Sequence, residues 1–127
     1  MAQSGTYHFP AVGESNYVKL FDGTLIQWGI VSGDIPSNSA YSDQTVTFPV
    51  PFHESTGNPC VVIGISALGV GATDIANICL PMAVNLNVTS TMLTQFTWRL
   101  WKQASVGASA NNPKPVASWV ALGRWKA

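Results

Sequence analysis

Apolar and polar residues alternate along much of this chain with the two-residue period that is typical of β-strands. The alternation is clearest over residues 26–30, 46–50, 96–100 and 118–125. A short run at 86–89 with β-branched residues adds another predicted strand. By contrast, no segment keeps the 3.6-residue period of a helix over several turns. The pattern therefore predicts a protein built from strands.

Segment 60–68 is almost continuously apolar, which predicts a central strand with both faces buried. Turn-forming residues separate the predicted strands at 32–43, 53–59, 69–76 and 104–115. Regularly spaced strands with turns between them are typical of a β-sandwich or a small barrel. We predict an all-β, antiparallel β-sandwich.

The 127 residues suffice for a single domain with one core. Residues 1–15 show no clear period, so we interpret them as a lead-in, and residues 16–127 as the folded domain. The best local signal lies at the start of that domain. It predicts a strand at 17–20, a turn at Asp22 and Gly23, and a second strand through Trp28. An Asp-Gly pair between strand formers favours a tight hairpin, because glycine tolerates the positive φ of such turns.

The same segment, 16–29, resembles the opening of the C-terminal tip domain of tailed-bacteriophage tail fibres, in which Tyr-Val-Lys-Leu, a turn with glycine and Ile-Gln-Trp-Gly follow one another. Residues 46–52, Val-Thr-Phe-Pro-Val-Pro-Phe, are similar to the family strand Val-Thr-Phe-Pro-x-x-Phe. Residues 118–124 are similar to its terminal Trp-x-Ala-x-Gly strand. The chain departs from the pattern at Phe21, where the family often has proline, and after Gly123, where the family often has tyrosine.

The resemblance implies a homotrimeric domain at the distal tip of a phage or prophage tail fibre, made in the host cytoplasm. Its function would be to attach the virion to a bacterial surface receptor, either the sugars of lipopolysaccharide or an outer-membrane protein. One alternative is a purely structural domain that trimerises and caps the fibre. Another is a fragment of a polysaccharide depolymerase.

The amino-acid composition restricts the classes of partner that the protein is expected to bind. Only 9% of the residues are charged, against a typical ~25%, and the formal net charge is zero. Such a surface suits either an oligomer that hides much of its area or a ligand rich in hydroxyl groups. It lacks the basic stripe of a nucleic-acid binder. The chain also lacks the ~20 consecutive apolar residues of a membrane span, and its first residues do not resemble a signal peptide.

The sequence contains little evidence for a group of catalytic or metal-binding residues, so we expect a protein that is not an enzyme and that uses no cofactor or metal. A glycosidase needs two convergent carboxylates, but none of the acidic residues lies in a predicted core strand: Glu14, Asp22, Asp34, Asp43, Glu54 and Asp74. The two histidines, His8 and His53, are too far apart for metal-ligand spacing. Cys60 and Cys79 lie in apolar segments and are predicted to be free, buried thiols.

The tryptophans are the remaining sequence evidence for a binding surface. Trp28, Trp98 and Trp119 share strand faces with aliphatic residues and are predicted to lie in the core. Trp101 falls on the face opposite that of Trp98, and an exposed tryptophan meets either another subunit or a ligand. Trp125, near the C-terminus, could likewise contact another subunit or a ligand, and we expect it to be buried against a neighbouring subunit.

The predicted receptor site is centred on Trp101 and Lys102, at the end of a strand, and on Asn111 and Asn112 in the loop that follows. An aromatic platform beside amide and ammonium donors suits a sugar, and functional contacts concentrate on loops held by a rigid scaffold. Two rival loops are nearly as good, namely 32–43 with Tyr41 and 69–76 with Asp74.

Overall fold

The computed structural model describes residues 3–4, 10–34, 39, 41–70, 79–83, 93–102 and 114–127. Within these residues the chain forms one short 3-10 helix, η1 (Glu54–Thr56), and eight strands. The strands are β1 (Gln3–Ser4), β2 (Ser15–Lys19), β3 (Thr24–Ser32), β4 (Tyr41–Thr47), β5 (Cys60–Val70), β6 (Cys79–Ala83), β7 (Gln95–Lys102) and β8 (Lys114–Arg124). The described helix is far too short to cross a membrane. The predicted strand at 86–89 lies outside the described residues.

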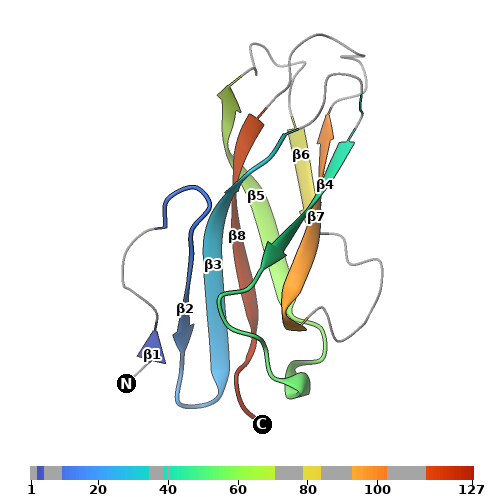
Figure 1. The fold of residues 1–127 in the computed structure, drawn as a ribbon. Coiled ribbons are helices and arrows are strands. Elements are labelled where there is room, and N and C mark those ends of the chain that lie inside the picture. The colour runs from blue at the N-terminus through green and yellow to red at the C-terminus, as the bar shows by residue number, and fades with distance from the viewer. Residues whose placement is uncertain are drawn as a thin grey trace.

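The strands form two antiparallel sheets (Figure 1). One sheet has five strands in the order β1-β2-β3-β8-β5, and the other has three in the order β4-β7-β6. Buried side chains from both sheets belong to one core cluster, so the sheets pack face to face. The predicted all-β, antiparallel sandwich is confirmed. Alternation produces this arrangement because successive strand residues point to opposite sides, which leaves one side of each sheet for the core.

Aromatic residues fill the space between the sheets. Trp119 on β8 and Trp98 on β7 are almost fully buried, which confirms their predicted place in the core. The ring centroids of Phe96 and Trp119 lie 5.3 Å apart, an edge-to-face contact between the two sheets. Gly29 on β3 lies opposite Trp119, and a Cβ atom at Gly29 would come within 2.7 Å of the indole nitrogen. A glycine is therefore needed for β3 to accommodate the large ring.

The predicted hairpin is present. Gly23 has a φ of +98°, and the backbone N–H of Thr24 donates to the Asp22 carboxylate at 2.9 Å. In the paired strands Tyr17 lies opposite Gln27. The Asp-Gly turn thus sets the register of β2 against β3, and the register decides which residues face the core.

The face of β3 that points inward differs from the prediction. Gln27 and Leu25 are buried against the second sheet, whereas Trp28 lies on the outer face and is only partly buried. The predicted place of Trp28 in the core is therefore wrong. Gln27 is tolerated inside because its Nε2 donates to the Val50 carbonyl at 2.8 Å and its Oε1 accepts from the Val50 N–H at 2.9 Å. A buried amide with both groups paired avoids the cost of desolvation.

The apolar segment 60–68 also differs from its prediction. Its strand, β5, lies at the edge of the five-stranded sheet, with Ile63 packed inward and Val62 exposed on the outer face. Cys60 is free, as predicted, but it is exposed instead of buried. The strand looked doubly buried because the outer face of this sheet is itself apolar. The side chain of Cys79 lies outside the described part of the structure.

Candidate functional site

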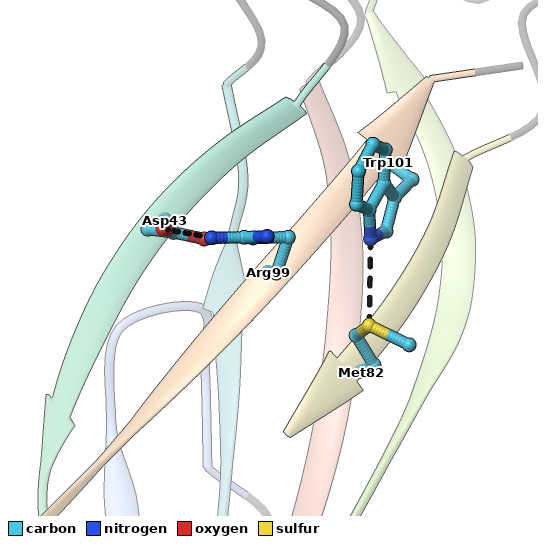
Figure 2. A network of polar contacts seen from close by, with 4 residues as sticks. All are labelled: Asp43, Met82, Arg99 and Trp101. Atoms are coloured by element: carbon cyan, nitrogen blue, oxygen red, sulfur yellow. Dashed lines mark hydrogen bonds and ion pairs between the residues drawn. The ribbon is translucent and has the colours of Figure 1, made fainter. Parts of the chain in front are cut away.

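Five side chains form a cluster on the outer face of the three-stranded sheet, and Figure 2 draws all of them except Tyr41. We call it the aromatic cluster; it consists of Tyr41 and Asp43 from β4, Met82 from β6, and Arg99 and Trp101 from β7. Alternation places them there. Because Phe96, Trp98 and Leu100 of β7 point into the core, the odd-numbered residues of that strand must point outward.

The register of the sheet brings these residues together. Tyr41 lies directly opposite Trp101, and Asp43 lies opposite Arg99. On the other side of β7, Met82 also lies opposite Arg99. The Tyr41 and Trp101 rings are 4.9 Å apart between centroids and tilted by 48°. Direct cross-strand neighbours of this kind are the closest side-chain pairs that a sheet offers.

Arg99 connects the charged and aromatic parts of the cluster. Its Nε donates to Asp43 Oδ1 at 2.7 Å and its Nη2 donates to Asp43 Oδ2 at 2.9 Å, which is a bidentate pair. The guanidinium carbon also lies 4.2 Å from the Tyr41 ring centroid and 5.5 Å from that of Trp101. These distances fall within the range of cation–π contacts. A partly exposed guanidinium is thereby fixed in one orientation.

Both charges of the pair are stabilised. The hydrogen bond from Arg99 holds the pKa of the Asp43 carboxyl below its ordinary value, against a smaller opposing effect of desolvation. The same bond raises the pKa of Arg99. The pair is partly exposed, so its contribution to stability is small. Its importance lies in orientation: the cluster presents an acceptor and a donor while carrying no net charge.

The indole of Trp101 has a weak partner. Its Nε1–H donates to the Met82 sulfur at 3.4 Å (Figure 2), and a thioether is a poor acceptor. A hydroxyl or carbonyl oxygen from a ligand would be a better acceptor. Asp43 and Arg99 also keep hydrogen-bonding capacity, because a carboxylate offers about four acceptor positions and a guanidinium five donors. The cluster therefore combines a flat aromatic surface with polar groups that can bind further partners.

The structure joins two predicted candidates that the sequence offered as rivals. Trp101 and Tyr41 are neighbours, and Tyr41 begins strand β4 where the sequence predicted a loop. Lys102 is the last residue of β7, but its side chain lies outside the description. The predictions for Asn111, Asn112 and Asp74 also fall outside the described residues.

Sequence reasoning missed Asp43, Arg99 and Met82 as members of the site. The sequence does contain a signal for the first two. Tyr41 and Asp43 are two residues apart, as are Arg99 and Trp101, and that spacing puts an aromatic ring and a charge on one strand face. The sequence contains no comparable signal for Met82.

Trp125 is held by its own chain. Its Nε1 donates to the Leu20 carbonyl at 2.8 Å, and its ring packs against the core. The ammonium groups of Lys19 and Lys126 lie 5.3 Å and 4.9 Å from the ring centroid. Its expected burial against another subunit is therefore not needed to explain this residue. Within the described residues, no group of three or more His, Cys, Asp or Glu side chains could hold a metal ion.

The fold is an antiparallel β-sandwich with an aromatic cluster on one outer face. Comparison with solved structures finds a similar fold in a fibre protein. The chain is similar to a structure of the R1 pyocin fiber of P. aeruginosa comprising C-terminal residues 323–701, with a TM-score of 0.62 and 18% identity. The match covers 97% of this chain and 28% of that one, so this chain spans less than a third of the fibre segment.

The sequence identifies the family. Residues 19–124 match the family described as "Putative tail fiber protein gp53-like, C-terminal", and the chain belongs to this family of tail fibre C-terminal domains. The resemblance seen in its strand motifs is confirmed, and the protein is a component of a tail fibre. Comparison with curated proteins gave no match.

Proposed function

We propose that this domain is the receptor-binding tip of its tail fibre and that it attaches the particle to sugars on a bacterial surface, those of lipopolysaccharide in particular. The aromatic cluster is the proposed contact. Membership of the tail fibre family supports the role. The observation that carries it is the contact among the outward-facing Tyr41, Arg99 and Trp101 side chains, of which Tyr41 is exposed and the other two are partly exposed.

The chemistry of the cluster fits a sugar. One side of a sugar ring presents C–H groups that pack on an aromatic face, and its hydroxyls both donate and accept hydrogen bonds. Tyr41 and Trp101 would supply the face, while Asp43 and Arg99 would supply the acceptors and donors. Tryptophan, tyrosine and arginine are also the residues that most often dominate binding energy at recognition surfaces. An outer-membrane protein is the second receptor class that such a cluster could contact.

We propose binding without hydrolysis. Retaining and inverting glycosidases ordinarily place two carboxyl groups on either side of the scissile bond. Among the described residues of the cluster, Asp43 is the one carboxylate, and Arg99 holds both of its oxygens. A carboxylate with a lowered pKa is also unsuited to act as a general acid near neutral pH.

The arrangement of the strands supports a distal position for the cluster. In Figure 1, β1 and the C-terminal end of β8 lie at one end of the sandwich. Tyr41 at the start of β4 and Trp101 near the end of β7 lie toward the opposite end. A fibre shaft that joins the domain before β1 would therefore leave the cluster nearer the end of the sandwich that is farther from the shaft.

We further propose that the fibre carries three copies of the domain. A single sugar site is commonly weak, whereas linked sites turn later binding events into intramolecular ones. Avidity can exceed the affinity of one site by ~10²–10⁴ without any new contact. A homotrimer presenting three aromatic clusters would gain from this effect.

The test is binding of the purified domain to host cells and to a glycan array. Trp101→Ala should weaken binding about tenfold or more, because truncating a central aromatic residue at such a surface costs at least 1–2 kcal/mol. Phe21→Ala is the matched control, since it removes an exposed aromatic ring from the β2–β3 turn. If a folded Trp101→Ala variant and the Phe21→Ala control both bind like the parent, the cluster is not the receptor site.

A structural domain that trimerises and caps the fibre is the second candidate function. The exposed apolar face of the five-stranded sheet favours it, because such a face suits permanent contact with protein. If the parent domain is oligomeric but binds neither cells nor glycans, this second function replaces the first.

A further inference from the structure

The outer face of the five-stranded sheet is unusually apolar. In two rows across its strands, Cys60 lies beside Leu122 and Ile26, and Val62 lies beside Val120 and Trp28. Val62, Val120 and Leu122 expose 65%, 42% and 43% of their surface. We call this surface the apolar face. Ordinary sheets of this kind alternate apolar and polar residues, with the polar side toward water. Here both sides are apolar.

The apolar face also lacks charge. None of the outward-pointing residues within 26–30, 60–64 and 118–122 is ionisable at neutral pH apart from the weakly acidic thiol of Cys60. The outer face of the other sheet differs, because it carries the Asp43–Arg99 pair. One outer face thus suits contact with water and ligands, whereas the other suits contact with protein.

The apolar face approaches the size of a functional apolar patch. Neighbouring strands are about 4.8 Å apart and residues rise about 3.4 Å, so three strands and five residues cover roughly 250 Å². The largest apolar patch on a single soluble protein is roughly 300–600 Å² and is often functional. A stable interface needs about 800 Å² on each partner. The apolar face would therefore form the dry centre of a larger contact with a polar rim.

We propose that the apolar face is the surface through which copies of this chain contact one another, with β3, β5 and β8 of each copy turned toward the shared axis. This inference rests on the fibre assembly proposed above. A second copy is the occupant that the chain's own charges favour: with 9% charged residues and zero net charge, identical copies do not repel each other. The uncharged face can meet itself without placing like charges in contact. The aromatic cluster, on the other sheet, would stay exposed.

Cys60 provides a direct reporter, because it is a free, exposed thiol within the apolar face. The experiment uses the full chain with Cys79→Ser, so that Cys60 is the single thiol. Mass is measured by light scattering, thiol accessibility by the rate of maleimide labelling, and folding by circular dichroism. The parent should be an oligomer of the 13.5 kDa chain with Cys60 protected.

Val120→Lys places a charge at the centre of the apolar face. We expect a folded variant with the mass of one chain, and Cys60 labelling at least tenfold faster than in the parent. Thr45→Lys is the matched control, since it introduces the same residue at an exposed position of β4 on the other outer face. The control should keep the mass and the labelling rate of the parent.

If Val120→Lys does not fold, Val62→Ser makes a milder change at the most exposed position of the face and should show the same shift. The proposal is overturned if a folded variant keeps the parent's mass and protection, or if the parent itself is a single chain with a reactive Cys60. It is also overturned if the parent sediments with lipid vesicles and Val120→Lys does not. Failure of receptor binding is a separate result, because an oligomeric parent with protected Cys60 that binds no cells refutes only the proposed function.

Discussion

Gln27 offers the sharpest test of how the two sheets are held together. Its side chain has no exposed surface and forms both of its hydrogen bonds with the backbone of Val50, at 2.8 Å and 2.9 Å. The Gln27 amide thus pairs with the Val50 backbone as a residue of a neighbouring β-strand would. The two hydrogen bonds connect β3 to the segment that follows β4. Gln27→Met keeps the length of the side chain and removes both bonds.

The expected loss follows from those contacts. Two hydrogen bonds contribute about 1 kcal/mol each, and leaving the partly buried Val50 N–H and carbonyl unpaired costs about as much again. Gln27→Met should therefore lower the free energy of unfolding by about 2–4 kcal/mol, partly offset by the apolar burial of methionine. For a domain of this size that corresponds to a fall in Tm of roughly 6–20 °C.

The assay is urea or thermal unfolding followed by circular dichroism at one fixed protein concentration, since assembly shifts apparent stability. Gln95→Met is the matched control, because Gln95 is partly exposed on the outer face of β7. A change in Tm for Gln27→Met as small as that of the control would refute the reasoning. It would mean that the pairing with Val50 adds nothing beyond filling space.

Gln27→Glu extends the same test to pH. Burial raises the pKa of a carboxyl above the ordinary ~4.3 of glutamic acid. The protonated form can both donate and accept at Val50, as the amide does, whereas the charged form cannot donate. A raised folded pKa favours the folded state at low pH and loses that advantage as pH rises through it. The free energy of unfolding of Gln27→Glu should therefore fall least below that of the parent near pH ~4, and the difference should grow toward neutral pH.

Other predictions follow from single sites. Gly23→Val should cost about 1–3 kcal/mol in unfolding experiments, because φ is +98° there; Gly57→Ala, at φ +68° with open space around it, should cost less. In an NMR titration the pKa of the Asp43 carboxyl should lie below the ordinary 3.8 of an aspartic acid and return toward it in Arg99→Gln. Because Arg99 lowers the pKa of Asp43 in the folded state, the ion pair stabilises the fold above pH 3.8. This stabilisation is lost as the pH falls through the folded pKa. Trp125→Phe should lose about 1 kcal/mol with its indole hydrogen bond, and no change in Tm would contradict that bond.

Features with local causes were predictable from the sequence. The turn at Asp22 and Gly23 depends on neighbouring residues alone, and the structure contains it. The burial of Trp98 in β7 and of Trp119 in β8 was also predictable. In both strands apolar and polar residues alternate, so only the apolar face can point into the core. These two kinds of signal were enough to predict the fold class.

Alternation failed where both faces of a strand are apolar or where a polar residue is buried. In β3 the large Trp28 points outward and Gln27 inward, because the partner that satisfies Gln27 is the Val50 backbone, 23 residues away in sequence. In β5 the exposed Cys60 and Val62 resembled core residues because both faces of that strand are apolar. A short sequence pattern contains no information about such distant partners.

The aromatic cluster was predictable in its parts but not in its assembly. Trp101 stood out because it lies on the outer face of β7, and Tyr41 because it is aromatic and near a loop. Their contact depends on the register of β4 against β7, which also pairs Asp43 with Arg99 across 56 residues of sequence. That register results from the packing of the whole sheet.

The irregular edge strand β5 has a consequence for how far the domain can associate. Among the described strands, this 11-residue strand pairs with β8 alone, and a long open edge is a template for strand addition and aggregation. Its register shifts between Ile65 and Ala67 and again between Ala67 and Val70. Such bulges bend and twist a strand, so another strand cannot pair along its full length. The edge thus discourages unlimited growth of the sheet into fibrils and leaves association through faces, which can close at a small number of chains.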